Sequence, residues 1–413
     1  MFKVAVLGCG VVGSGVADIL LEQSEKLSKR FARDIALSKI LDIRDMTGTP
    51  YAPYMVKDAD DILNDPEIRA VVVTIGGLDF AYELAKKALL AGKHVVTSNK
   101  EVVAARGREL TKIAYEKKVR FLYEASSGGG IPIIRPLGIC LASNDIYEIR
   151  GILNGTTNYI LTKMQTAGAS FEAALKRAQE KGYAEANPAA DVDGHDAARK
   201  IAILSSIAYD RFVDYTQVAC TGIRNVTAED HYFANQLGCV IKLIARSAFR
   251  DGKVYASVEP YLLPKSHMLA SVNSVYNAVL VKGSYTGDTL FYGQGAGKLA
   301  TASAILGDLI EILCGADTMP SLPAFTDQDA EIGEVASEKS RYLVRFSFRD
   351  TPGGEYETTL LQLFRAGQYE IAPQTKSGGI VTDYMTSAEL EKAVTELEKA
   401  TCLKVANKIK LTD

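Results

Sequence analysis

The chain has 413 residues, of which 47% are apolar and 23% charged, and its formal net charge is −3. These values are typical of a globular protein with two or three domains, and they exclude a strongly basic surface for nucleic acid or an anionic membrane. No apolar run approaches the roughly 18 residues that a membrane helix needs. The chain starts directly in a strand-like run and its six cysteines are scattered, so we expect no signal peptide, free thiols and a cytoplasmic location. The four scattered histidines give no basis for a zinc site.

The first element is a short apolar strand that leads into a Gly-x-Gly-x-x-Gly motif and then into a helical pattern. Gly8 permits a tight turn, Gly10 lets a pyrophosphate approach the backbone, and Gly13 lets the helix pack on the strand. Val11 and Val12 stand at the start of that helix, whose free N–H groups would face the phosphates. The motif therefore predicts dinucleotide binding, and the alternative is a tight structural turn.

The second expected strand covers residues 35–43, and its end carries the signals for the type of cofactor. An acidic residue there would hold the ribose 2′-OH of NAD, whereas a basic residue would accept the 2′-phosphate of NADP. Asp42 favours NAD, while Arg44 at the tip and Lys57 favour NADP, which we expect. Alternatively, Arg44 and Lys57 are two solvated surface residues.

Further apolar runs at residues 69–75, 94–97 and 120–123 are typical of buried parallel strands, so we expect a Rossmann-type domain over residues 1–132. Lys100 follows the second of these runs. Ligands bind outside the carboxyl ends of the strands in an open α/β sheet, which puts Lys100 at the cofactor crevice. The alternative is a surface lysine that flanks a helix.

The loop from Glu124 to Ile131 contains three consecutive glycines. Glycine permits unusual backbone angles, so this loop can expose several carbonyl groups. Such a loop can cradle a substrate or a cation with oxygen ligands, or it can be a plain crossover between domains.

Residues 133–318 are expected to form a second domain, with strands and helices mixed. We expect a polar turn at residues 154–158, because it combines a glycine with asparagine and threonine. Residues 293–297 contain three glycines and predict a flexible turn before a helix.

The stretch of residues 182–200 is polar and places Glu185, Asp191, Asp196 and Lys200 within sixteen residues. The apolar pattern from Asp196 onward is helical, so Asp196 and Lys200 lie on one face, one turn apart. The simplest interpretation is a solvated ion pair. A loop that turns two more carboxylates toward the lysine would instead build a polar pocket for an amino group.

Residues 319–338 combine prolines and acids with little periodicity, which indicates a linker. Residues 339–413 show the order strand, helix, strand, strand, helix, strand, which is typical of a ferredoxin-like domain. The fold class expected for the whole chain is therefore α/β, with a Rossmann-type parallel sheet, an α+β second domain and a small ferredoxin-like domain.

Several of these segments together resemble the homoserine dehydrogenase family. The resemblance covers residues 1 to about 318 in the right order. The segments that carry it are Gly8–Gly13, Asn99-Lys100, residues 124–131, residues 154–161 (Asn-Gly-Thr-Thr-Asn-Tyr-Ile-Leu) and residues 182–200. The tail resembles the ACT amino-acid-sensing domain.

The resemblance implies the reversible, NAD(P)-linked interconversion of L-homoserine and L-aspartate 4-semialdehyde in threonine and methionine biosynthesis. It implies that Lys200 is the acid/base at the substrate oxygen and that Lys100 assists near the nicotinamide. The substrate-binding residues would be Glu185, Asp196, Asp191 and Thr157. The full set expected at the cofactor is Gly8, Gly10, Val11, Val12, Gly13, Arg44, Lys57, Lys100, Gly182 and Gly297. A monovalent cation, Na⁺ or K⁺, is implied at Glu124, Ser127, Gly129 and Ile131.

The resemblance also suggests a homodimer and threonine as an effector of the tail. Two other functions stay open, an amino-acid dehydrogenase that acts at a C–N bond and a cofactor-bound sensor without turnover. The set of Lys100, Glu185, Asp196 and Lys200 favours an enzyme, because a sensor has no need of an acid/base pair. Nucleic-acid and membrane partners are not expected.

Overall fold

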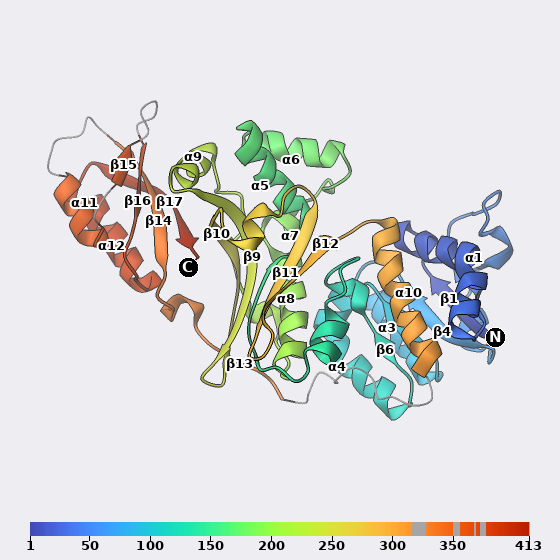
Figure 1. Cartoon of the computed structure of the whole chain (residues 1–413). Coiled ribbons are helices and arrows are strands. Elements are labelled where there is room, and N and C mark those ends of the chain that lie inside the picture. Colours follow the sequence, from blue (N-terminus) through green and yellow to red (C-terminus); the bar gives the residue numbers. More distant parts are fainter. Residues whose placement is uncertain (316–327, 350–355, 367–368, 372–376, 413) are drawn as a thin grey trace.

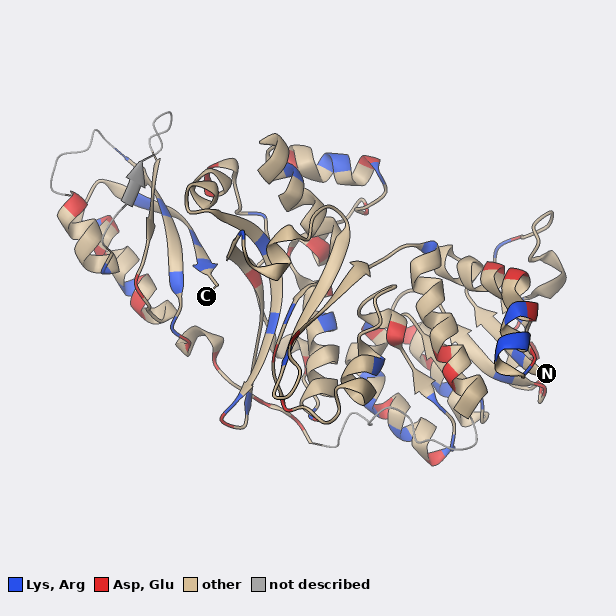
Figure 2. Cartoon of the chain, in the orientation of Figure 1, with Lys and Arg blue, Asp and Glu red and all other residues tan. Residues whose placement is uncertain are grey.

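The computed structural model describes residues 1–315, 328–349, 356–366, 369–371 and 377–412. Within these residues the strands form two sheets, and Figure 1 shows the first sheet, the larger sheet and the C-terminal elements one after another along the molecule. Acidic and basic residues are interspersed along the elements seen in Figure 2, in keeping with the small net charge. No helix in the described ranges combines the length and the hydropathy needed to cross a membrane.

The first sheet is parallel and has the strand order β3-β2-β1-β4-β5-β6. Its strands are β1 (Phe2–Leu7), β2 (Ile35–Leu41), β3 (Met55–Val56), β4 (Ile68–Val73), β5 (His94–Thr97) and β6 (Phe121–Leu122). The helices between them include α1 (Val11–Phe31), α2 (Asp60–Leu63), α3 (Asp79–Leu90) and α4 (Lys100–Glu116).

The order of this sheet reverses between β1 and β4, and that reversal is where open α/β sheets bind ligands. Residues 4–7 of β1 and 70–73 of β4 are almost fully buried. Both strands are covered on both faces, which explains their continuous apolar runs. The Rossmann-type sheet expected from the sequence is confirmed.

The larger sheet has the order β12-β11-β7-β9-β10-β17-β14-β16-β15, and β8 and β13 also pair with β10. Its strands before the tail are β7 (Ile146–Ile152), β8 (Ala219–Cys220), β9 (Cys239–Arg250), β10 (Lys253–Pro264), β11 (Tyr276–Gly283) and β12 (Gly287–Gln294). The helices of this part are α5 (Gly155–Ala167), α6 (Phe171–Glu180), α7 (Ala189–Val192), α8 (His195–Ala208) and α9 (Ala228–Gln236). Most side chains of α8 are buried, because this helix lies between the larger sheet and α4 of the first part.

The polar turn expected at residues 154–158 is wrong, because these residues start α5. Asn154 has an extended backbone, and its side-chain oxygen accepts a hydrogen bond from the N–H of Thr157. This is the N-cap arrangement, which offsets the low helix propensity of the glycine and the two threonines that follow.

Helix α10 (Lys298–Gly315) returns from β12 to the first part of the molecule and packs beside α1 (Figure 1). A Cβ atom on Gly15 of α1 would lie 2.8 Å from the carbonyl oxygen of Lys298, so the two helices require glycine at their contact. The unit expected over residues 133–318 is therefore divided in space, with α10 packed beside α1 of the first part. The two connections between the parts run together, because the N–H of Gly130 donates to the carbonyl of Gln294 at 3.0 Å.

The tail comprises β14 (Arg341–Phe348), α11 (Tyr356–Phe364), β15 (Tyr369–Ile371), β16 (Ser377–Val381), α12 (Ser387–Ala400) and β17 (Leu403–Leu411). This is the expected ferredoxin-like order, and the tail has an apolar core of its own. It is nevertheless continuous with the larger sheet, because β17 pairs in parallel with β10 and Lys410 forms an ion pair with Glu259 at 2.7 Å. Part of the expected linker is also ordered, since β13 (Glu331–Ile332) pairs with β10, while residues 316–327 lie outside the described ranges.

Candidate active site

The glycine motif forms the turn between β1 and α1, and its three glycines have different surroundings. Gly8 has a φ of 97°, in the left-handed region that favours glycine. A Cβ atom on Gly13 would lie 1.8 Å from the carbonyl oxygen of Gly8, whereas a Cβ atom on Gly10 would meet no atom within 4 Å. No side chain caps α1 at Gly10, so the first N–H groups of the helix are available to an anion. The residues present therefore fit the pyrophosphate of a dinucleotide.

The end of β2 holds a tight ion pair. The Asp42 carboxylate accepts hydrogen bonds from the N–H of Cys9 at 2.7 Å and from Nε and Nη2 of Arg44 at 2.9 and 2.7 Å. Hydrogen bonds from Arg44 hold the pKa of Asp42 well below its usual range. Lys57 is used differently, since its ammonium donates to the carbonyls of Asp42, Ile43 and Arg44 at 3.0, 3.0 and 2.7 Å. Lys57 thus fixes the loop that presents Arg44.

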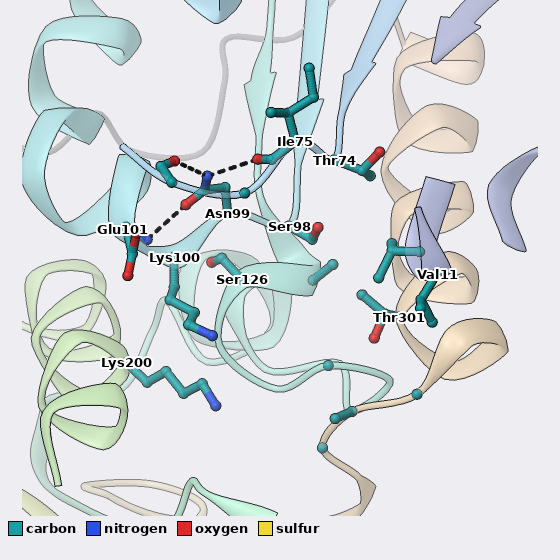
Figure 3. Close-up of a pocket in the computed structure, with 18 of the residues that line it drawn as sticks. Val11, Thr74, Ile75, Ser98, Asn99, Lys100, Glu101, Ser126, Lys200 and Thr301 are labelled. Atoms are coloured by element: carbon teal, nitrogen blue, oxygen red, sulfur yellow. Dashed lines mark hydrogen bonds between the residues drawn. The ribbon is translucent and has the colours of Figure 1, made fainter. Parts of the chain in front are cut away.

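A pocket of about 450 Å³ opens where the carboxyl ends of the first sheet face the larger sheet (Figure 3). Its lining comes from the start of α1, the ends of β4 and β5, the start of α8 and the two connections between the parts. These lining residues include Val11, Val12, Thr74, Ser98, Asn99, Lys100, Ser126, Gly129, Glu185, Lys200, Gly295, Ala296 and Gly297. The pocket therefore joins the glycine motif to the polar stretch that the sequence singled out.

The two lysines of this pocket share one carboxylate. Lys100 Nζ lies 2.9 Å from Oδ1 of Asp196, and Lys200 Nζ lies 2.7 Å from Oδ2. Lys200 also donates to the carbonyl oxygen of Leu153 at 2.8 Å. Two of the three N–H donors of Lys200 are thereby engaged, which leaves one for a ligand. Figure 3 shows both ammonium groups pointing from different helices into the same space.

Asn154 connects Asp196 to a second carboxylate. Its side-chain nitrogen donates to Oδ1 of Asp191 at 2.7 Å and to Oδ2 of Asp196 at 3.0 Å. Asn154 and Asp196 are only 5% and 4% exposed, so these bonds are shielded from water.

Burial and charge act in opposite directions on these groups. Burial alone would raise the pKa of the Asp196 carboxyl, but the charges of Lys200 and Lys100 overcome it and hold that pKa well below its usual range. The charge of Asp196 raises the pKa of Lys100 against its burial. For Asp191, burial raises the pKa, and the nearby charge of Asp196 adds to this. The site therefore holds an ionised Asp196 and a charged Lys100 at neutral pH.

Two family models match the chain, "Homoserine dehydrogenase" over residues 132–310 and "Homoserine dehydrogenase, NAD binding domain" over residues 8–124. A homoserine dehydrogenase from Synechocystis sp. is 42% identical over 365 residues, which cover 85% of this chain and 84% of the relative. The chain belongs to the homoserine dehydrogenase family. It is also similar in structure to a homoserine dehydrogenase from Thiobacillus denitrificans, with a TM-score of 0.89 and 34% identity over 100% of this chain and 98% of the other.

Another similar structure is a hyperthermophilic archaeal homoserine dehydrogenase in complex with NADPH, with a TM-score of 0.64 and 28% identity over 75% of this chain and 97% of the other. Homoserine dehydrogenases are NAD(P)-dependent oxidoreductases that interconvert L-homoserine and L-aspartate 4-semialdehyde. The family membership assigns this activity to the chain and decides against a C–N dehydrogenase and a sensor without turnover.

The structure brings many of the expected homoserine dehydrogenase residues together. Lys100, Lys200, Glu185 and Gly297 line one pocket, and Asp196 and Asp191 lie directly behind the lysines. Thr157 and Gly182 are not in its lining. The hydroxyl of Thr157 is buried on Asn154, at 3.1 Å from the carbonyl oxygen and 3.0 Å from Oδ1, and Gly182 is exposed after α6.

The loop expected to hold a monovalent cation in homoserine dehydrogenases carries Glu124, Ser127, Gly129 and Ile131. Glu124 is 3% exposed, and its carboxylate accepts the N–H groups of Ile133, Ile134 and Arg135 at 2.6, 2.8 and 2.8 Å. Its side chain is therefore committed to fixing the loop, so a cation would rely on main-chain carbonyls. In the described part of the chain, no cluster of three or more His, Cys, Asp or Glu residues could hold a metal ion.

Two asparagines at this homoserine dehydrogenase site lie in the segments that carry the resemblance but have no predicted role of their own. Asn99 caps α4, accepting the N–H groups of Glu101 and Val102 at 3.0 and 3.1 Å, and it donates to the carbonyls of Ile75 and Gly77 (Figure 3). Asn99 thus fixes the first turn that carries Lys100. Asn154 caps α5 in the same way. The available signal was an asparagine just before each helix.

Proposed function

We propose that Lys200 is the acid/base of the reaction and that Lys100 assists it at the nicotinamide side of the pocket. The observation that carries this is the single carboxylate of Asp196, which holds both ammonium groups within 2.9 Å in one pocket with the glycine motif. Asp196 keeps both lysines in place, and the carbonyl of Leu153 fixes Lys200 from the other side.

The bound cofactor supplies hydride transfer to and from the substrate carbon. When the semialdehyde is reduced, Lys200 gives a proton to the carbonyl oxygen as that oxygen becomes a hydroxyl. When homoserine is oxidised, Lys200 takes the hydroxyl proton. Asp196 and the carbonyl of Leu153 leave one N–H of Lys200 unused, and this N–H is the one that would serve the first direction.

We propose that Glu185 and Asp191 hold the substrate's ammonium group, because carboxylates are its natural partners. Glu185 lines the pocket from the loop before α7. Thr157 supports the site through Asn154, since its hydroxyl is engaged there. Gly182 acts through the loop that carries Glu185.

We propose NADP as the preferred cofactor. Asp42, the residue that would hold the ribose 2′-OH of NAD, already accepts bonds from Cys9 and Arg44. Arg44 has a side chain that is 54% exposed and free to add a phosphate to its contacts. Lys57 supports Arg44 by holding the carbonyls of this loop.

We further propose a Na⁺ or K⁺ ion at the carbonyls of Glu124, Ser127, Gly129 and Ile131. Support comes from Gly129, which has a φ of 59° and stands where a Cβ atom would lie 2.2 Å from the carbonyl oxygen of Gly295. The loop is therefore tightly packed against the chain at Gly295, and such close packing is needed for a preformed cation site. Activity with Na⁺, K⁺ and a bulky organic cation in the buffer tests this directly.

The remaining proposals concern assembly and regulation. We propose that the protein is a cytoplasmic homodimer. Its domains would be a Rossmann-type domain (1–132), to which α10 is added, a catalytic domain (133–318) without α10, a linker (319–338) and an ACT-like domain (339–413). The ACT-like domain would sense threonine. The ferredoxin-like order of the tail supports the last point. Threonine added to the assay should reduce activity, and its failure to bind would remove this proposal.

The test of the proposed chemistry is NADPH oxidation with L-aspartate 4-semialdehyde, compared with NADH as the cofactor. We expect turnover with both dinucleotides and a higher kcat/KM with NADPH. Turnover that requires an amine substrate would contradict the proposal.

A further inference from the structure

Asn154 occupies the junction between β7 and α5, directly after the residue whose carbonyl holds Lys200. The two ends of its side-chain amide make different contacts. Oδ1 accepts the N–H of Thr157 at 2.9 Å, and Nδ2 donates to Asp191 at 2.7 Å and to Asp196 at 3.0 Å. The backbone N–H requires an oxygen opposite it, so the NH₂ end must face the two carboxylates.

We propose that Asn154 is a positioning residue for the reaction, whose amide clamps Asp191 and Asp196 together and thereby sets the place of both lysines. This inference rests on the proposed roles of Lys200 and Asp196. It extends them to a residue that is not part of the pocket lining.

The clamp is needed because two carboxylates in a buried site repel each other. The charged groups facing this pair are Lys200 from α8 and Lys100 from α4, and both lie on Asp196. Asp191 has no lysine of its own within bonding distance among the described residues, and Asn154 supplies the donor that it would otherwise lack. Among the described residues, the neutral NH₂ group of Asn154 is the only hydrogen-bond donor that bonds both acids at once.

The same amide links the clamp to the fold. Capping by Oδ1 fixes the start of α5, and the preceding carbonyl of Leu153 fixes Lys200 at 2.8 Å. One turn later, Asn158 anchors α5 by donating to the carbonyls of Val272 and Tyr276 at 3.1 and 3.0 Å. One strand–helix junction therefore positions Lys200 and the two carboxylates, and a catalytic site requires such rigid support.

Asparagine is the one residue type that can do both tasks at this position. Aspartate caps a helix as well as asparagine does, but it cannot donate a hydrogen bond when ionised. Serine also caps a helix but is too short to reach both acids. Substitution by either residue thus keeps the N-cap of α5 and removes the hydrogen bonds to Asp191 and Asp196.

The experiment uses the full chain with Asn154→Asp, Asn154→Ser and Lys200→Ala. Ser170→Asp is the matched control, because Ser170 caps α6 at an exposed position and the substitution adds the same charge. The readouts are thermal unfolding, NADPH affinity by fluorescence, and the pH dependence of kcat and kcat/KM for semialdehyde reduction.

We expect both Asn154 variants to lower kcat by about 10²-fold, since small displacements of catalytic groups have effects of this size. NADPH affinity should stay unchanged. Loss of the amide bonds also raises the pKa of Asp191 and Asp196, because those bonds stabilise the charged carboxylates. The acid limb of kcat/KM should therefore move to higher pH in both variants and stay fixed in Ser170→Asp.

A purely capping role for Asn154 gives a different result. In that case Asn154→Asp and Asn154→Ser keep kcat and the acid limb while Lys200→Ala is inactive, and the inference is overturned. If Asn154→Asp fails to fold, the uncharged serine variant decides between the two roles. Full activity of Lys200→Ala would instead overturn the proposed chemistry itself.

Discussion

Lys100 and Lys200 bind the two oxygens of one carboxylate, although they lie 100 positions apart in the sequence and belong to two different helices, α4 and α8, which pack against each other. Asp196 is 4% exposed, so this bridge forms in a site largely shielded from water. Without the carboxylate, the two positively charged ammonium groups would repel each other. Asp196 therefore joins α4 of the first part of the molecule to α8 of the second part at the pocket.

The first prediction concerns this bridge. Asp196→Asn keeps the shape of the side chain and removes the charge that raises the pKa of Lys100. The pKa of Lys100 then falls, so the lysine loses its proton at a lower pH. We expect the alkaline limb of kcat/KM for semialdehyde reduction to move to lower pH, and kcat to fall by about 10²-fold.

The control for this variant is Asp193→Asn. Asp193 lies in the same segment but pairs with Arg224 at the surface, and its side chain is 32% exposed. Its pH profile should match that of the unsubstituted enzyme. An Asp196→Asn profile that also matches would mean that the bridge does not tune the lysines.

The second prediction compares two glycines of the same motif. Gly10→Ala adds a methyl group that meets no protein atom within 4 Å, so thermal stability should not change. The methyl group would stand where the pyrophosphate approaches the backbone, so NADPH affinity should fall by about tenfold or more.

Gly13→Ala is the matched variant, and we expect it to change thermal stability, which Gly10→Ala should leave unchanged. Its Cβ atom would lie 1.8 Å from the carbonyl oxygen of Gly8, so the turn between β1 and α1 must shift and the melting temperature should fall. Differential scanning fluorimetry with and without NADPH separates the two cases. Equal loss of stability in both variants would contradict the assigned position of the pyrophosphate.

The third prediction concerns cofactor preference. Arg44→Ala removes the exposed guanidinium at the end of β2. A charge-assisted hydrogen bond contributes about 1.5–3 kcal/mol, so the KM for NADPH should rise by about tenfold or more. The KM for NADH should not rise, because Asp42 is released to accept the ribose hydroxyl. An equal rise for both cofactors would place the 2′-phosphate elsewhere.

Local sequence signals were sufficient for much of the fold and part of the site. The Gly8–Gly13 turn and the buried strands of the first sheet depend on neighbouring residues, so spacing and apolar runs predict them. Asp196 and Lys200 lie one turn apart on a helix, which periodicity also predicts. The rule that ligands bind at the carboxyl ends of parallel strands predicted that Lys100 lies at the cofactor crevice, but not that it pairs with Asp196.

Features that depend on distant contacts were not predictable in this way. The sequence predicts a turn at the start of α5 because Gly155 and two threonines are poor helix formers, but the N-cap by Asn154 starts the helix there. Nothing local indicates that β17 extends the sheet at β10, since Tyr261 and Lys410 are far apart in sequence. The packing of α10 on α1 depends likewise on Gly15 meeting Lys298.

The turnover of Lys200→Ala decides whether Lys200 transfers the proton, and Lys176→Ala on the exposed face of α6 is the control. NADPH binding should be unchanged, because the glycine motif and Arg44 are intact. The rate of semialdehyde reduction at saturating cofactor should fall by about 10²–10⁴-fold, as expected for loss of a general acid. Unchanged turnover in Lys200→Ala would contradict the central claim that Lys200 transfers the proton.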